Sequence, residues 1–223
     1  MEEFVWPDPP EQTAFPVAKA GYPFIFSAAF ATAVFALLGL VVPALLGLFA
    51  TLCICCFFRD PDRVVPNVEG GVVSPADGKV IFVGPVAENP FMEGPALKIS
   101  VFMTVFNVHV NRVPVEGRIA DVVYHPGKFF SANLDKASDD NERNAVILET
   151  SRGERICFVQ IAGLIARRII CHVKQGDTVR KGQRFGLICF GSRLDVYLPA
   201  GAVPRVQAGD KVQAGTSLLG SLI

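Results

Sequence analysis

The sequence predicts a mainly β domain preceded by an N-terminal hydrophobic helical hairpin. Three observations support this prediction. The 39 residues from Ala20 to Phe58 contain no Asp, Glu, Lys, Arg or His. After Phe58 the chain consists of short apolar runs separated by Gly and Pro, and one ten-residue pattern in that part occurs twice.

The composition places the apolar excess in one part of the chain. The 223 residues carry 21 Lys+Arg and 21 Asp+Glu, 51% are hydrophobic, and the mean hydropathy is +0.40. Such a chain is too apolar to be disordered, and its charge balance argues against nucleic-acid binding, which usually needs a basic surface. Without residues 20–58, charged residues make up about 23% of the rest, close to the globular norm. We therefore expect a polar N-terminal segment (1–21), a membrane-associated helical hairpin (22–58) and a β-rich domain (59–223).

The uncharged block is too long for one straight membrane-spanning helix. A helix of its length would extend about 58 Å, against a hydrocarbon core of ~30 Å. Gly39 and Pro43 interrupt the block, so the sequence predicts two helices, at 22–38 and 42–58, that form a tight hairpin or a re-entrant loop. A soluble helical hairpin is the alternative, but soluble helices usually carry a polar face.

A hairpin places both of its flanks on the same side of the membrane. Lys19 precedes the block, and Arg59 and Arg63 follow it. By the positive-inside rule, these flanks favour a protein of the inner cell membrane whose β domain faces the cytoplasm. The cysteines lie in apolar runs, which suggests buried thiols, and no metal site is expected.

Nine short apolar or alternating runs predict the strands of the β domain. They lie at residues 71–74, 79–83, 96–106, 118–124, 145–149, 155–161, 169–173, 184–189 and 194–198. Runs of this length, separated by turn residues, are typical of all-β sandwiches and barrels. The polar and acidic residues 131–144 predict a loop.

The repeated pattern is V-x-x-G-D-x-V-x-x-G, at residues 173–182 and again 33 residues later at 206–215. It predicts two strand–turn–strand hairpins in which Gly supplies the positive φ of a tight turn. The pattern resembles the hammerhead hairpin of biotinyl and lipoyl carriers. Residues 59–223 are therefore expected to form a lipoyl/biotinyl-like β-sandwich.

Three segments carry residues that could take part in chemistry. Asp77 lies in S-P-A-D-G-K between two expected strands, where a structural turn is the simpler explanation of that motif alone. His109 lies at the end of a strand beside Asn107 and Asn111, and is either an acid/base group or a structural histidine. Arg143, in N-E-R-N, either meets an anionic ligand or lies in a solvated turn.

The pair Gly191–Ser192 lies between the two repeated hairpins, in F-G-S-R-L-D. A hydrolase nucleophile elbow would need G-x-S-x-G and a strand-to-helix turn, and the sequence has neither. A Gly–Ser bond in a tight turn does permit an intramolecular N→O acyl shift. Glycine allows this because it lets the serine hydroxyl approach the preceding carbonyl.

Five motifs occur in a characteristic order along the β domain. They are S-P-A-D-G-K, F-x-x-x-x-N-x-H-x-x-R-x-P-x-x-G, N-E-R, V-x-x-G-D-x-V-x-x-G-Q and F-G-S-R-L-D-V-Y-L-P. Each motif is weak alone, but the ordered set resembles the phosphatidylserine decarboxylase proenzymes, in their short, pyruvoyl-dependent bacterial form. The resemblance covers about residues 59–200.

The resemblance implies a proenzyme that cleaves itself between Gly191 and Ser192. Ser192 would attack the Gly191 carbonyl, elimination from the resulting ester would leave dehydroalanine, and hydrolysis with loss of ammonia would leave a pyruvoyl cofactor. A β chain (1–191) and an α chain (192–223) would form a heterodimer, with further oligomerisation left open. The pyruvoyl carbonyl would form a Schiff base with phosphatidylserine and accept the electrons released as CO₂ leaves, giving phosphatidylethanolamine.

The resemblance also implies residue roles. Ser192 matches the pyruvoyl precursor, Asp77 the aspartate that helps activate it, and His109 the proton donor of decarboxylation. Longer relatives have a second histidine, their base for self-cleavage, where this chain has Arg112, which stays protonated at pH 7. Three alternatives account for self-cleavage without that base: His109 serves both steps, Asp77 acts more directly, or backbone strain drives cleavage. The arginines expected to contact the anionic substrate are Arg112, Arg143 and Arg193.

Two other functions fit parts of the sequence. A membrane-anchored, lipoyl-like binding module would explain the repeat, but it needs a modifiable Lys at a hairpin tip, and both Gly-Asp hairpins lack such a site. A serine hydrolase acting on lipids would use Ser192, His109 and Asp77 as a triad and would remain an intact chain. The decarboxylase interpretation predicts phosphatidylserine and the membrane as partners, without nucleic acid.

Overall fold

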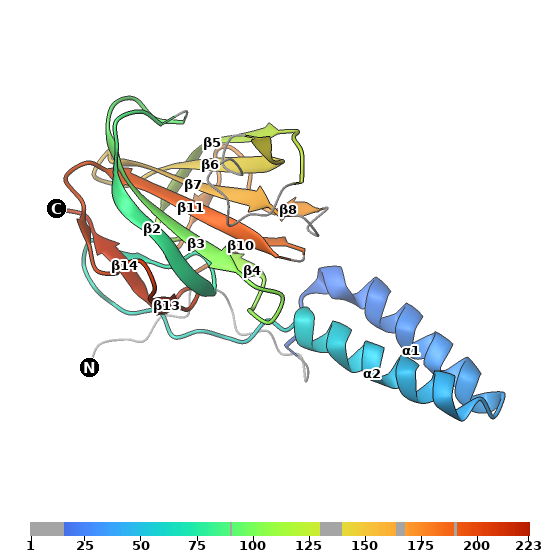
Figure 1. The fold of residues 1–223 in the computed structure, drawn as a ribbon. Coiled ribbons are helices and arrows are strands. Elements are labelled where there is room, and N and C mark those ends of the chain that lie inside the picture. Colours follow the sequence, from blue (N-terminus) through green and yellow to red (C-terminus); the bar gives the residue numbers. More distant parts are fainter. Residues whose placement is uncertain (1–15, 90, 130–139, 164–167, 190) are drawn as a thin grey trace. The chain divides into compact units, whose positions relative to one another are not determined.

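The computed structural model describes residues 16–89, 91–129, 140–163, 168–189 and 191–223. The described chain forms two compact units that divide between Asp62 and Arg63. The first unit contains the two helices, and the second contains all the strands (Figure 1).

The first unit is the predicted helical hairpin. Helices α1 (Tyr22–Leu37) and α2 (Val41–Phe57) agree with the predicted bounds to within one residue, so the predicted pair of helices is confirmed. Gly39 makes the turn between them at a φ of 69°, a conformation that glycine adopts without strain. The helices approach closely, since a Cβ at Gly47 would lie 2.5 Å from Thr32 Oγ1.

One helical segment of this unit is a candidate membrane span. Within the described residues, Lys19–Leu37, which joins the 3₁₀ turn Lys19–Gly21 to α1, is long and apolar enough to cross a membrane by length and composition. Helix α2 is also apolar but is shorter than this segment. Two backbone hydrogen bonds join the segments that flank the helix pair. The Ala18 amide donates to the Phe58 carbonyl at 2.8 Å, and the Asp60 amide donates to the Pro16 carbonyl at 2.7 Å.

The second unit is built from antiparallel strands, and all nine predicted runs are confirmed as strands. The strands are β1 (Gly71–Val73), β2 (Gly78–Val86), β3 (Ala96–Met103), β4 (Val110–Arg112), β5 (Gly117–His125), β6 (Arg143–Glu149), β7 (Arg155–Ala162), β8 (Ile169–Cys171), β9 (Thr178–Val179), β10 (Arg184–Ile188), β11 (Ser192–Pro199), β12 (Val203–Pro204), β13 (Lys211–Val212) and β14 (Leu218–Ser221). The expected loop at 131–144 lies largely outside the described residues, and its last two residues begin β6.

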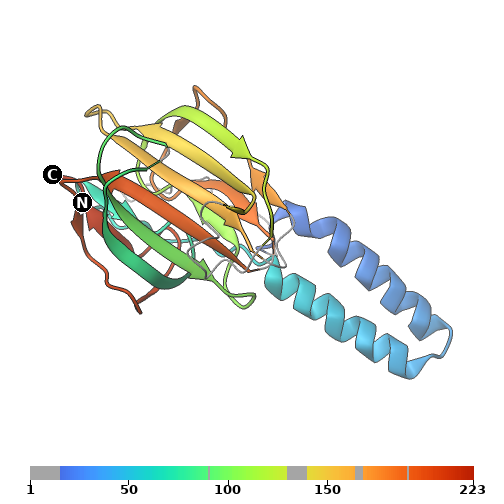
Figure 2. The same cartoon turned by 45° about the horizontal axis from the view of Figure 1, so that its top comes forward.

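The strands form one large sheet and two small ones. The large sheet is curled and has the order β13-β2-β3-β11-β7-β6-β5-β9 (Figures 1 and 2). The small sheets have the orders β1-β14-β12 and β4-β10-β8. The main apolar core draws residues from all three, and Phe158 of β7 packs edge-on against Phe185 of β10 with ring centroids 4.8 Å apart. The mainly β fold class is confirmed, while the lipoyl-like sandwich stays a prediction.

The β unit consists of two similar halves, which the sequence pattern shows only in part. Adding 39 to the bounds of β1 and β2 gives the bounds of β4 and β5. Each half uses one of the repeated hairpins in the same way: the Val80 amide donates to the Asp210 carbonyl, and the Ile119 amide to the Asp177 carbonyl, both at 2.8 Å. The repeats therefore close the two opposite edges of the large sheet through β13 and β9.

Gly78 shows how tightly this sheet is packed. A Cβ at Gly78 would lie 2.2 Å from the Phe102 carbonyl oxygen on β3. Gly78→Ala must therefore separate the two strands, and we expect it to lower the free energy of unfolding by about 2–4 kcal/mol. Thermal or denaturant unfolding of the full chain in detergent measures this. Gly201→Ala is the control, because no atom lies within 4 Å of a Cβ there. Equal stability of the two variants would contradict the described β2–β3 packing.

Candidate active site

Ser192 is the first residue of β11 and is fully buried. It lies opposite Met103 of β3 on one side and Ala162 of β7 on the other. Its hydroxyl donates to Met103 Sδ at 3.4 Å. Gly191 before it has a φ of 61°, a left-handed conformation that costs other residues roughly 1–2 kcal/mol. The predicted cleavage site thus combines a buried hydroxyl with a backbone conformation suited to glycine.

A chain of buried amides leads to this serine, and the sequence interpretation missed it. Asn111 Nδ2 donates to Met103 Sδ at 3.8 Å, and Gln160 Nε2 donates to Asn111 Oδ1 at 3.0 Å. Asn144 Nδ2 in turn donates to Gln160 Oε1 at 3.2 Å. The available signal was Gln160, a polar residue at a core-facing position of the apolar strand β7.

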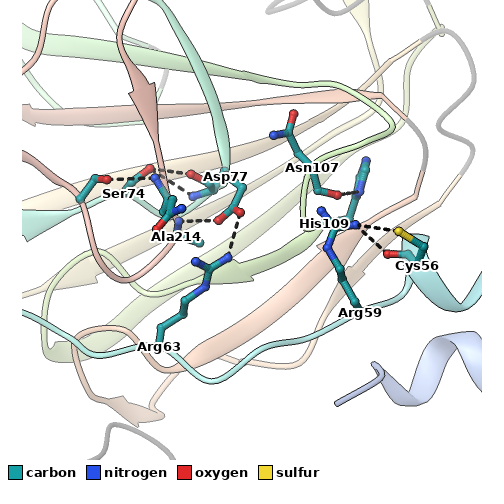
Figure 3. Close-up of polar contacts among 11 residues, drawn as sticks. Cys56, Arg59, Arg63, Ser74, Asp77, Asn107, His109 and Ala214 are labelled. Carbon is teal, nitrogen blue, oxygen red and sulfur yellow. Dashed lines mark hydrogen bonds and ion pairs between the residues drawn. The ribbon is translucent and has the colours of Figure 1, made fainter. Parts of the chain in front are cut away.

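His109 immediately precedes β4 and is fully buried. Its Nδ1 lies 2.9 Å from the Asn107 carbonyl oxygen (Figure 3). A carbonyl oxygen only accepts hydrogen bonds, so Nδ1 carries the hydrogen and the neutral ring has its lone pair at Nε2. Two residues further on, Asn111 is also fully buried, and its amide donates to the sulfur beside Ser192.

Asp77 lies in the turn between β1 and β2, where two contacts fix its carboxylate (Figure 3). Arg63 donates to Oδ2 at 2.9 Å, and the Ala214 amide donates to Oδ1 at 2.7 Å. In the large sheet, β3 separates β2 from β11, so the backbones at Gly78 and Ser192 are two strand spacings apart, about 10 Å. Asp77 is therefore at the same end of the sheet as Ser192, in the turn before a strand that is not adjacent to β11. The role of Arg63 as its partner was not predicted.

Arg112 connects the two repeated hairpins. It is 3% exposed, and its guanidinium donates to the Gly182 carbonyl at 3.0 Å. Its Cδ lies 2.9 Å from the position of a Cβ on Gly215. Gly182 and Gly215 are the equivalent last glycines of the two repeats. These contacts give Arg112 a structural task, beside which its predicted contact with an anion stays a prediction.

The other two predicted arginines lie on the opposite face of the large sheet from Ser192. Arg193 forms a two-point ion pair with Asp195, at 2.6 and 2.7 Å. Alternation along β11 puts this pair on the face of Tyr197, whereas Ser192 shares the face of the main core. Arg143 lies on that outer face too, with its guanidinium 5.9 Å from the Phe91 ring centroid. The structure does not bring these two arginines together with Ser192.

Cys189 carries a thiol, and it lies two residues before Gly191 of the expected cleavage bond. Burial raises the pKa of its thiol above the ordinary value, and the nearby Arg168 guanidinium offsets part of that shift. The thiol is therefore protonated at neutral pH. A protonated thiol is a poor nucleophile, so Ser192 has no thiolate competitor at Cys189.

Comparison of the sequence with known proteins identifies the family of this chain. A family model for phosphatidylserine decarboxylase matches residues 50–220. A phosphatidylserine decarboxylase proenzyme from Geotalea uraniireducens is 52% identical over 93% of this chain and 97% of its own. Proteins of the same name from Desulfotalea psychrophila and Nitratidesulfovibrio vulgaris are 48% and 50% identical, over 95% and 91% of this chain and 99% and 93% of theirs. With matches of this extent, the chain belongs to the phosphatidylserine decarboxylase family.

Proposed function

We propose that this chain is a proenzyme that cuts itself at Gly191–Ser192 and then decarboxylates phosphatidylserine with a pyruvoyl group derived from Ser192. The observation that carries the proposal is the buried Ser192 hydroxyl directly after a glycine with a φ of 61°, in a chain of the decarboxylase family. Cleavage would give a β chain of residues 1–191 and an α chain of residues 192–223.

His109 is the residue to which we assign both proton transfers. Asp77 is bound by Arg63 and Ala214, and Arg112 is a protonated donor to Gly182. The Asn107 carbonyl fixes the His109 tautomer, so Nε2 can take the proton of the Ser192 hydroxyl as it attacks the Gly191 carbonyl. After cleavage, the same nitrogen can return a proton to the substrate carbon.

The surroundings of Ser192 fit a small ketone group. When present, a pyruvoyl group supplies an electron sink for the loss of CO₂. Met103 and Asn111 would border it, the first as a polarizable apolar wall and the second as an N–H donor. Ser192 and Met103 are both fully buried, so these side chains also exclude water from the reacting centre.

The helical hairpin supports a location at the membrane. Aromatic and aliphatic side chains are exposed along both helices, among them Phe26, Phe30, Leu46 and Phe49. Exposed apolar surface of this extent fits a lipid environment. We propose that the hairpin holds the chain in the inner cell membrane with the β unit on the cytoplasmic side, as the flanking Lys19, Arg59 and Arg63 favour.

A chemical test separates this function from lipid hydrolysis by a serine triad. Sodium borohydride reduces a ketone to an alcohol and leaves a serine hydroxyl unchanged. We expect treatment before substrate addition to remove the release of CO₂ from phosphatidylserine, in parallel with a two-hydrogen mass gain on the α chain. Activity that survives full reduction, or lipid hydrolysis in place of CO₂ release, would contradict the proposal. The contact of His109 Nδ1 with Asn107 also argues against a triad, which would need Asp77 there.

A further inference from the structure

The loop between β3 and β4 has an exposed apolar tip. Within the residues Thr104–His109, Phe106 is 83% exposed and Val105 is 39% exposed. Both neighbouring strands are buried, and the loop ends in the buried residues Val108 and His109. The two exposed apolar side chains therefore lie at the tip of a loop that ends in buried residues.

The tip is held by a defined turn. Asn107 Oδ1 accepts hydrogen bonds from the Thr104 amide at 2.9 Å and from the Thr104 hydroxyl at 2.8 Å. The Asn107 amide donates back to the Thr104 carbonyl at 3.0 Å. These three bonds fix the backbone on either side of Val105 and Phe106. The turn that exposes these two side chains is therefore well defined.

This turn is directly connected to the proposed chemistry. It starts after Met103, whose sulfur contacts the Ser192 hydroxyl, and it ends at His109. The same Asn107 that accepts from Thr104 through its side chain fixes His109 Nδ1 through its carbonyl. The exposed tip is therefore joined at both of its ends to residues of the proposed site.

A positive charge borders the same place. Arg168 is exposed, and its carbonyl accepts from the Cys189 amide at 3.1 Å. The next residue, Ile169, pairs with Ile188, whose amide lies 3.4 Å from the His109 carbonyl oxygen. One strand, β10, thus separates Arg168 from the end of the loop.

We propose that this active-site rim, made of Thr104–His109 and Arg168, docks on the surface of an anionic phospholipid leaflet. Phe106 enters the boundary between headgroups and acyl chains, and Arg168 contacts lipid phosphate. An apolar tip beside a cation is the usual composition of an interfacial anchor. The inference rests on the proposed function, since a buried Ser192 can process a lipid only if its headgroup leaves the leaflet at this rim.

Fluorescence of the full chain tests the docking directly. The chain has one tryptophan, Trp6, so Phe106→Trp is made in a Trp6→Phe background. With vesicles of phosphatidylcholine and phosphatidylglycerol, we expect a blue shift and stronger quenching by acyl chains brominated near the headgroup than by chains brominated deeply. Phe82→Trp, at a 40% exposed position of β2, is the matched control and should be quenched much less. Equal quenching of the two probes, or a blue shift that needs no vesicles, would overturn the proposal.

Activity separates the rim from the proposed chemistry. Phe106→Ser and Arg168→Gln should each lower the turnover of vesicle phosphatidylserine at limiting lipid by about tenfold, the effect of losing one interfacial anchor. Chain cleavage at Gly191–Ser192 should be complete in both variants, because it involves no lipid. Unchanged turnover in both variants refutes the rim alone. An uncut, active wild-type chain refutes the proposed function. The quenching result then tests the docking of the rim independently.

Discussion

Ser192→Ala is expected to leave the chain uncut and without decarboxylase activity. The substitution removes the hydroxyl that attacks Gly191, and without this hydroxyl the pyruvoyl group cannot form. Loss of a covalent nucleophile lowers rates by more than about 10³-fold, so no cleavage should be detected over hours. Gel mobility and intact mass report the cleavage, and CO₂ release from phosphatidylserine reports the activity.

The fold should tolerate this change. The Ser192 hydroxyl donates only a weak bond to the Met103 sulfur, so its loss should cost less than about 1 kcal/mol of stability. Ser100→Ala is the matched control, since Ser100 is a buried serine on the neighbouring strand β3. We expect the control to be cut and active. Normal processing of Ser192→Ala would show that the cleavage site is elsewhere.

His109→Ala is expected to slow both self-cleavage and turnover. A positioned acid or base contributes about 10²–10⁴-fold to a proton-transfer step, and the Asn107 carbonyl holds the His109 ring in the tautomer required. Turnover should be measured per cleaved chain, so that a processing defect is separated from a defect in decarboxylation.

The control for this variant is another histidine of the same unit. His172 is exposed on the segment after β8, and His172→Ala should be cut and should turn over substrate like the wild type. If His109→Ala also matched the wild type in both rates, His109 would have no catalytic role, and the assignment of both proton transfers would be wrong.

Local patterns predicted the parts of this fold that local forces determine. The uncharged block predicted the two helices because it is apolar throughout and because Gly39 and Pro43 interrupt it. Nine strands followed from apolar runs between turn residues. β9 and β13 lie where the repeated hairpins predict a returning strand, whereas β4, β12 and β14 were missed, because such short segments owe their pairing to partners far away in the sequence.

From the sequence, the two-fold organisation of the β unit is recognisable only in the repeated hairpin pattern. The 33-residue repeat keeps Gly and Asp because its tight turns require them. The 39-residue relation preserves little more than a proline, an acidic residue, a glycine and a basic residue, in 75–79 and 114–118. Apolar strand residues can be exchanged freely within a packed core, so this relation became visible in the register of the strands.

The site was predictable where one short motif contains it and not where strand register assembles it. Gly191–Ser192 is a single dipeptide, while Met103 and Asn111 reach Ser192 from β3 and β4. Arg193 shows a pattern that was overlooked. Adjacent residues of a strand point to opposite faces, so a Ser192 that faces the core requires an Arg193 that does not.

Intact mass of the purified wild-type protein is the most direct test of self-cleavage. We expect two chains, one ending at Gly191 and one of residues 192–223 that is lighter by one ammonia than the corresponding unmodified peptide. The smaller chain should also resist sequential degradation from its N-terminus, because a ketone has no amine to react. A single full-length chain that decarboxylates phosphatidylserine would contradict the pyruvoyl mechanism.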